Sequence, residues 1–182
     1  MKSVLWAAAL ALLPLLAGCG GKSGGEAPGA DSTAFAAPAA QQGPASDPAS
    51  SSRAEAEIDG HRYEVKMRRY ADKSGEVVRS ELGEESYDNR VEVSILRDGS
   101  AFKRKTFSKA DFADFLTDTD RAVSVLQGMA FTGADAEGLH FAAQVGERDV
   151  EGGMAFIVTV STDGLVSVVR DYNQDTTGSA SQ

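Results

Sequence analysis

The chain has 182 residues, of which 18 are Lys or Arg and 27 are Asp or Glu, and its formal net charge at pH 7 is -9. Nucleic-acid binding requires clustered positive charge, so this balance argues against a nucleic-acid ligand and against binding to anionic lipid through bulk charge. The only cysteine is Cys19, which excludes an internal disulfide and a thiolate zinc site.

The beginning of the chain has the pattern of an export signal. Lys2 supplies a short positive region, residues 4–16 are rich in apolar side chains, and the small residues Ala17 and Gly18 precede Cys19. Residues 1–18 with Cys19 resemble a bacterial lipoprotein signal. The resemblance implies cleavage between Gly18 and Cys19, a thioether bond from Cys19 to diacylglycerol, and acylation of the new amine.

Ordinary secretion and an uncleaved membrane anchor are the alternative interpretations of this segment. Lipidation is favoured because two small residues precede Cys19, and because 13 apolar-rich positions fall short of the roughly 20 that a spanning helix needs. We therefore expect the lipid at Cys19 to hold the protein to a membrane of the cell envelope. Gly20 rather than Asp follows Cys19, which by resemblance to known sorting behaviour predicts the outer membrane and leaves its periplasmic or surface face open.

Residues 19–52 are predicted to be the lipidated cysteine followed by a disordered tether. Between Gly20 and Ser52, 25 of 33 residues are Gly, Ala, Pro or Ser, and Phe35 is the only large apolar side chain. Such a segment buries too little surface to offset the entropy lost on ordering. A flexible linker of this length reaches about 30 Å, so we expect the tether to lift the domain off the membrane.

Residues 53–175 are predicted to form a single domain, and residues 176–182 a flexible tail. Three Asp-Gly dipeptides lie between runs of alternating apolar and polar residues, which is the strongest short-range hairpin signal. The first dipeptide, Asp59-Gly60, predicts Ala56 opposite Tyr63. The second, Asp98-Gly99, predicts Ile95 opposite Phe102, with a bulge or a longer turn left open.

The third dipeptide, Asp163-Gly164, predicts a strand pair that is apolar on both faces. One face is predicted to hold Phe156, Val158, Val160, Leu165 and Val169, and the other Ile157, Val166 and Val168. Such a pair belongs in the middle of a sheet with a layer over each face, and helices are the expected cover. Residues 139–145 alternate as a further strand, followed by a polar loop over residues 147–153.

One helix is predicted to begin at Ser108. Ser108 can cap the helix, Asp111 stands at the capping-box position, and Phe107 and Phe112 have the spacing of a hydrophobic staple. Residues 121–127 fit either a second short helix or a strand, with Gly128 expected to end the element. The order of elements predicts an α+β domain, in which one or two helices pack on a largely antiparallel sheet built from hairpins.

The succession of strands and turns resembles an uncharacterised family of lipid-anchored bacterial envelope lipoproteins, a domain of unknown function. The resemblance is carried by residues 91–96, the turn at 98–99, residues 105–112, residues 141–146 and residues 157–168. It rests on strand and turn patterns that span most of the domain. The resemblance implies that a small tethered domain recurs with this layout, and it implies no activity.

Only two histidines, His61 and His140, are available for histidine chemistry. His61 follows a turn and His140 lies on the strand face opposite Leu139, so a structural role is favoured for both. No Gly-x-Ser-x-Gly elbow or equivalent arrangement is present. We therefore predict no catalytic, cofactor-binding or metal-ligating residue.

Two acidic clusters lie in predicted loops, and both lack the EF-hand pattern. They are Glu147, Asp149 and Glu151, and Asp114, Asp118 and Asp120. Solvated loop charge is the favoured interpretation, and calcium binding is left open. The basic runs at residues 68–69 and 103–105 are interpreted as polar strand faces, because alternation sends neighbouring side chains to opposite sides of a strand.

These observations predict a non-catalytic binding module, tethered to the envelope, whose partner is a protein or a glycan bound at an exposed sheet face or edge. An envelope hydrolase that uses carboxylates and a purely structural spacer are the alternatives. Buried, converging carboxylates in a deep pocket would favour the hydrolase, and a shallow surface would favour binding.

Overall fold

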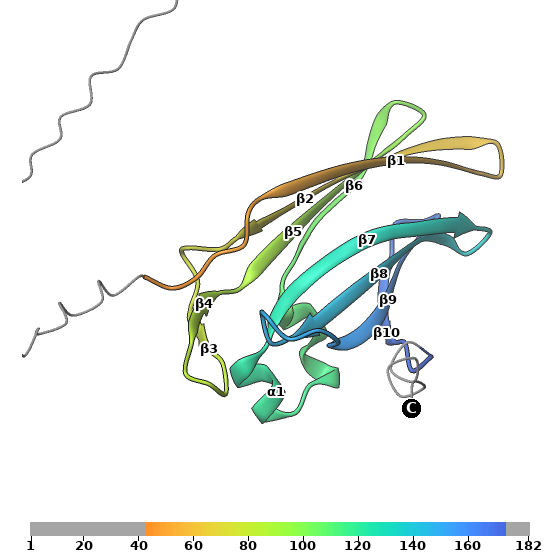
Figure 1. The fold of residues 1–182 in the computed structure, drawn as a ribbon. Helices are drawn as coiled ribbons and strands as arrows, with labels where there is room; N and C mark the ends of the chain where they lie inside the picture. The colour runs from red at the N-terminus through yellow and green to blue at the C-terminus, as the bar shows by residue number, and fades with distance from the viewer. Residues whose placement is uncertain (1–42, 174–182) are drawn as a thin grey trace, which may run out of the picture. The chain divides into compact units, whose positions relative to one another are not determined.

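The computed structural model describes residues 43–173 (Figure 1). The predicted signal peptide, Cys19, the tether before Gly43 and the predicted tail at residues 176–182 lie outside the described residues. The domain itself begins earlier than Arg53. Its first strand starts at Ser50, and Ala45 already forms backbone hydrogen bonds with the domain.

Two four-stranded antiparallel sheets make up most of the described chain (Figure 1). The first sheet has the order β1-β2-β5-β6 and is formed by β1 (Ser50–Ile58), β2 (His61–Ala71), β5 (Asn89–Arg97) and β6 (Ser100–Phe107). The second has the order β10-β9-β8-β7 and is formed by β7 (Val125–Asp135), β8 (Gly138–Gly146), β9 (Met154–Ser161) and β10 (Val166–Arg170). A small hairpin of β3 (Val77–Arg79) and β4 (Glu85–Tyr87) interrupts the connection from β2 to β5.

The two sheets contribute to one hydrophobic core. Alternate residues of β2 and β5 point into it from the first sheet, and alternate residues of β8 and β9 from the second. The buried side chains are Tyr63, Val65, Met67, Val91, Val93, Ile95, Leu139, Phe141, Ala143, Val145, Phe156, Val158 and Val160. The expected cover of the sheet is therefore supplied mainly by the other sheet, because each presents a continuous apolar face.

The predicted antiparallel, hairpin-built sheet structure is confirmed. The α+β assignment, with helices packed on the sheet, is not confirmed, because few of the described residues are helical. The element after Ser108 is the 3-10 helix η1 (Lys109–Phe115), and the second short helix is α1 (Asp118–Val123). Phe112 of η1 is fully buried, with its ring 4.9 Å from that of Phe156. Within residues 43–173 no helix is long and apolar enough to cross a membrane.

The first two hairpins follow the predicted turns. In β1–β2, Ala56 lies opposite Tyr63 as predicted. In β5–β6, Ile95 lies opposite Lys103 instead of Phe102, because a bulge between Ile95 and Leu96 shifts the register by one residue. The bulge lets Phe102 pack edge-on against Tyr63, with ring centroids 5.6 Å apart.

In the third hairpin, the predicted face of β9 is confirmed, since Phe156, Val158 and Val160 are buried together, but the predicted faces of β10 are wrong. The turn of this hairpin closes between Ser161 and Leu165, whose backbone N–H and C=O are 2.9 Å apart, so the loop is longer than the two residues assumed. A shift of one residue exchanges the two faces of a strand. As a result Val166 and Val168 pack on the core, while Leu165 and Val169 are exposed.

The prediction that Gly128 ends an element is also wrong. Residues 118–123 form α1, and β7 then continues through Gly128 to Asp135. Gly128 and Gly133 lie at two irregularities in the pairing of β7 with β8, one between Leu126 and Gly128 and one between Phe131 and Gly133. Bulges of this kind let a strand bend without ending.

Candidate functional site

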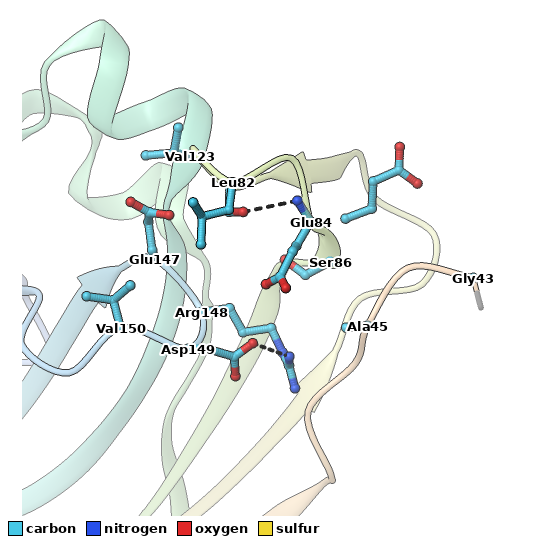
Figure 2. Close-up of a pocket in the computed structure, with 12 residues that line it drawn as sticks. Gly43, Ala45, Leu82, Glu84, Ser86, Val123, Glu147, Arg148, Asp149 and Val150 are labelled. Carbon is cyan, nitrogen blue, oxygen red and sulfur yellow. Dashed lines mark hydrogen bonds and ion pairs between the residues drawn. The ribbon is translucent and has the colours of Figure 1, made fainter. Parts of the chain in front are cut away.

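A cleft of about 420 Å³ lies where the N-terminal segment joins the domain (Figure 2). Three segments that are far apart in the sequence form its walls. They are residues 43–45 of the N-terminal segment, residues 80–86 around the turn between β3 and β4, and residues 147–150 of the loop between β8 and β9. Val123 at the end of α1 adds a further apolar side chain.

The cleft combines exposed apolar side chains with carboxylates. Leu82 is 88% exposed and Val150 is 53% exposed. Glu84, Glu147 and Asp149 supply negative charge, as Figure 2 shows. Such a surface can accept an apolar group together with a cation.

The N-terminal segment is fixed beside this cleft by backbone pairing. Ala45 forms an isolated parallel bridge with Ser86 of β4. The Ala45 N–H donates to the Glu85 carbonyl at 2.7 Å, and its carbonyl accepts from the Tyr87 N–H at 2.9 Å. The entering chain thus adds to the free edge of the β3–β4 hairpin.

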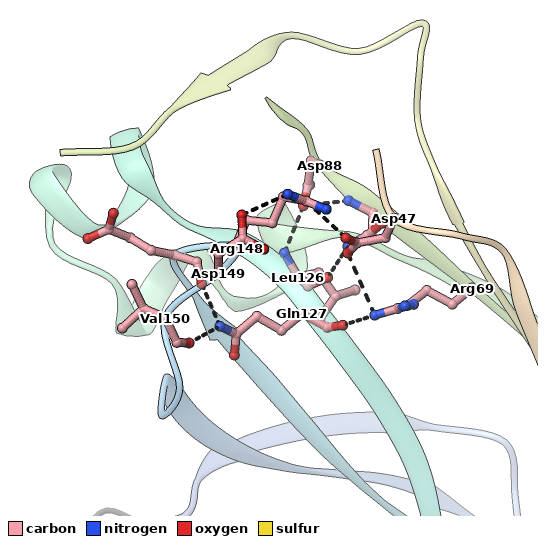
Figure 3. A network of polar contacts seen from close by, with 10 residues as sticks. Asp47, Arg69, Asp88, Leu126, Gln127, Arg148, Asp149 and Val150 are labelled. Carbon is pink, nitrogen blue, oxygen red and sulfur yellow. Dashed lines mark hydrogen bonds and ion pairs between the residues drawn. The ribbon is translucent and has the colours of Figure 1, made fainter. Parts of the chain in front are cut away.

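Asp47 is the centre of a polar cluster next to the cleft (Figure 3). One carboxylate oxygen accepts from Arg148 Nε at 2.9 Å, and the other accepts from Asn89 Nδ2 at 2.8 Å. Arg69 lies 3.7 Å from the second oxygen and donates to the Gln127 carbonyl at 2.5 Å. We call Asp47, Arg69, Asn89 and Arg148 the Asp47 cluster.

Asn89 and Asp88 extend this cluster into β7. Asn89 is fully buried, and its Nδ2 also donates to the Leu126 carbonyl at 2.9 Å. Asp88 Oδ1 accepts from the backbone N–H of Leu126 at 2.7 Å. Asn89 Oδ1 is buried without a hydrogen-bond partner among the described residues. The cluster therefore ties β5, β7 and the N-terminal segment together.

The loop that forms one wall of the cleft is held from two sides. Arg148 bridges Asp47 and Asp149, the latter at 2.7 Å. Gln127 Nε2 donates to the carbonyls of Glu147 and Val150, at 2.6 and 3.0 Å (Figure 3). These contacts fix the position of the loop and so fix the shape of the cleft.

Neither histidine lines the cleft. His61 Nδ1 lies 2.7 Å from Asp98 Oδ2 and links the turns of the first two hairpins. His140 lies on β8, with Nδ1 3.1 Å from Thr159 Oγ1 and Nε2 2.9 Å from Asp135. The hydrogen bond from His140 lowers the pKa of Asp135. Both rings join adjacent strands or turns.

Several carboxylates of the two predicted acidic clusters have separate protein partners. Asp120 caps α1 with Thr117, and the Thr117 hydroxyl lowers the pKa of Asp120. Asp118 pairs with Arg121 at 3.5 Å. Glu147 accepts from the Glu81 N–H at 3.3 Å. Among residues 43–173 no three acidic, histidine or cysteine side chains are grouped as metal ligands.

The sequence patterns did not reveal the cleft or the Asp47 cluster. Asp47 lies in a segment rich in Gly, Ala, Pro and Ser, and its partners are distant in the chain. The one available signal is that Asp47 is an isolated charge directly before Pro48, a pair of residues that favours a defined turn. Arg69 was interpreted as part of a strand face, and the fold directs it to Asp47.

Comparison with known families gives a match over residues 30–168 to the family described as a domain of unknown function, DUF4738. The chain belongs to this family. The resemblance found from strand and turn patterns is thereby confirmed as membership of a domain family of unknown function. Comparison with curated proteins gives no match. The DUF4738 match includes all three segments that form the walls of the cleft and the whole Asp47 cluster.

Proposed function

We propose that this DUF4738 chain is a lipid-anchored protein of the bacterial cell envelope, and that its domain is a non-catalytic module that binds a protein or a glycan. The observation that carries the binding role is the pair of exposed apolar side chains, Leu82 and Val150, at a cleft with fixed walls. Exposed apolar groups that line a hollow are characteristic of interaction sites.

The exposure of the carboxylates at the cleft supports binding over hydrolysis. A hydrolase of this kind needs buried carboxylates that converge in a deep pocket. Asp149 is instead 65% exposed and paired with Arg148, and Glu84 is exposed as well.

The anchor is proposed from the sequence around Cys19. We propose lipidation at Cys19 and attachment to the outer membrane, with the tether holding the domain away from the bilayer. Replacing Cys19 by Ser should abolish acylation and cleavage after Gly18, so the variant should keep Trp6 and migrate more slowly on a denaturing gel. Normal trimming and acylation of the variant would contradict the proposal. Protease treatment of intact cells then tells the two faces of the membrane apart. The domain should be degraded if it is on the cell surface and should survive if it faces the periplasm.

The binding role is tested with a photo-crosslinking residue at position 82 in intact cells. We expect a discrete cross-linked product, which should disappear when Val150 is changed to Asp. Leu165 is the matched control position, because it is an exposed leucine in the turn before β10. A crosslinker at 165 should give no such product. Equal results at positions 82 and 165 would favour the alternative of a structural spacer.

A further inference from the structure

The outer face of the first sheet carries a row of basic side chains that runs across its strands. Arg53 of β1 lies opposite Lys66 of β2, Lys66 lies opposite Ser94 of β5, and Ser94 lies opposite Arg104 of β6. Directly cross-strand residues share one face of a sheet. We call Arg53, Lys66, Ser94 and Arg104 the basic row.

A second line of residues adds one more cation beside this row. Arg68, two residues after Lys66 in β2, lies on the same face, opposite Glu92 of β5. The basic row, Arg68 and Glu92 line a shallow hollow of about 630 Å³. Four cations and one carboxylate thus line a hollow in a chain whose net charge is -9.

The positive charge of this surface is only partly neutralised by the protein. Arg53 pairs with Glu64 at 2.5 Å, and Arg104 pairs with Glu92 at 2.7 Å. Arg68 lies over the ring of Tyr70, 5.3 Å from its centroid, and forms no ion pair within residues 43–173. Lys66, at the centre of the row, has no hydrogen-bond or ion-pair partner in the described part of the chain. An exposed cation between two other cations favours an anionic ligand.

From this arrangement we propose that the basic row binds a linear acidic polysaccharide that crosses the strands of the first sheet. This inference rests on the proposed binding function. It assigns an acidic glycan to the basic row, which is a surface separate from the cleft at Leu82 and Val150. Adjacent strands lie about 4.8 Å apart, which is close to the length of one pyranose residue in an extended glycan. Each strand that the glycan crosses can therefore present one side chain to one sugar.

A linear chain fits this surface better than a flat anionic membrane does. Between the basic row and the β1–β2 turn, the same face of the sheet carries Glu55, Glu57 and Glu64. A membrane would meet these carboxylates together with the cations. A glycan that follows the basic row avoids them, and Lys66 and the neighbouring Arg68, which have no ion-pair partner within residues 43–173, remain available to its carboxylates or sulfates.

The test is fluorescence anisotropy with the full-length protein, purified from membranes in neutral detergent, and labelled alginate oligosaccharides. Alginate should bind, and neutral dextran of the same length should not. Lys66→Glu should weaken alginate binding about tenfold, and the affinity should fall with added salt. Lys73→Glu is the matched control, because it makes the same charge change in an exposed loop and should leave the affinity unchanged.

Alginate that binds no better than dextran would overturn the inference, as would equal losses in the Lys66 and Lys73 variants. Stronger binding of phosphatidylglycerol vesicles than of alginate, lost in Lys66→Glu, would assign the surface to a membrane and overturn it too. Should Lys66→Glu melt at a lower temperature, Lys66→Gln removes the charge without reversing it and should still weaken binding. The crosslink at position 82 reports on the proposed function separately.

Discussion

At the scale of single residues, Asp47 brings together three side chains that are far from it in the sequence. Its carboxylate contacts Arg148 and Asn89 directly and lies close to Arg69. The Asp47 side chain is 17% exposed, so these contacts are largely shielded from water. Removing one member of such a group leaves the other polar groups without compensation.

Asp47→Ala should lower the free energy of unfolding by about 2 kcal/mol, because Arg148 Nε and one N–H of Asn89 Nδ2 lose their acceptor at a largely shielded site. Asp149→Ala is the control, since Asp149 also pairs with Arg148 but is 65% exposed. That change should cost less than about 1 kcal/mol. Urea denaturation followed by circular dichroism measures both values. Equal losses in the two variants would show that burial of Asp47 does not decide its contribution.

The lowered pKa of Asp72 predicts that the fold loses stability in acid. Hydrogen bonds from Ser74 and from Arg90 lower the pKa of Asp72 from 3.8 to about 2. Between these pH values the unfolded chain binds a proton that the folded chain does not, so the contribution of Asp72 to stability is lost as the pH falls through this window.

Asp72→Asn should therefore flatten the dependence of stability on pH between about 4 and 2, and should make the protein less stable at neutral pH. Urea midpoints measured from pH 2 to pH 6 test this expectation. Glu57→Gln, a neutralised carboxylate on the exposed face of β1, is the control. If Asp72→Asn keeps the slope of the parent protein, Asp72 is not the group that titrates.

At the scale of elements, η1 contributes to the stability of the fold mainly through the buried ring of Phe112. The predicted capping partner is in place, since the Asp111 carboxylate accepts from the Ser108 N–H at 2.9 Å. Phe112 is fully buried against Phe156, whereas Phe115 contacts the same ring at 5.5 Å from an exposed position. Seven residues are too few to form a stable helix alone, so η1 depends on this packing.

Phe112→Ala should destabilise the fold by about 3 kcal/mol, because the deletion leaves a cavity in the core. Phe115→Ala should cost about 1 kcal/mol, because less of its surface is buried. Thermal or urea unfolding compares the two variants directly. A larger effect at Phe115 than at Phe112 would be inconsistent with the packing described for η1.

At the scale of the whole molecule, the folded domain includes part of the predicted tether. Ala45 pairs with β4, Asp47 joins β2, β5 and the loop after β8, and β1 begins at Ser50. The Asp47 cluster therefore connects the point where the chain enters to both sheets.

A chain that begins at Gly43 should unfold cooperatively, and one that begins at Arg53 should melt at a lower temperature, because it lacks Ala45, Asp47 and the start of β1. Calorimetry of the two chains measures the difference. Restoring residues 43–52 with Asp47 changed to Ala should recover only part of the loss. Equal melting temperatures for the chains from Gly43 and Arg53 would show that the N-terminal segment adds no stability.

The sequence alone determined the features that depend on neighbours along the chain. The first two Asp-Gly turns, the register of β1 with β2, the alternation of β8 and the capping residues of η1 all follow from local rules. The lipid anchor at Cys19 remains a prediction from the same kind of local pattern.

The tertiary structure decided the features that depend on residues brought together from distant segments. One additional residue in the third turn exchanged the faces of β10, and the opposite sheet took the place of the expected helical cover. Asp47 acquired partners up to 101 residues away. Alternation along a strand separates Arg68 from Arg69, yet cross-strand register aligns Arg53, Lys66 and Arg104 on one face. A periodic pattern fixes which way a side chain points, while only the pairing of strands fixes which other side chains stand next to it.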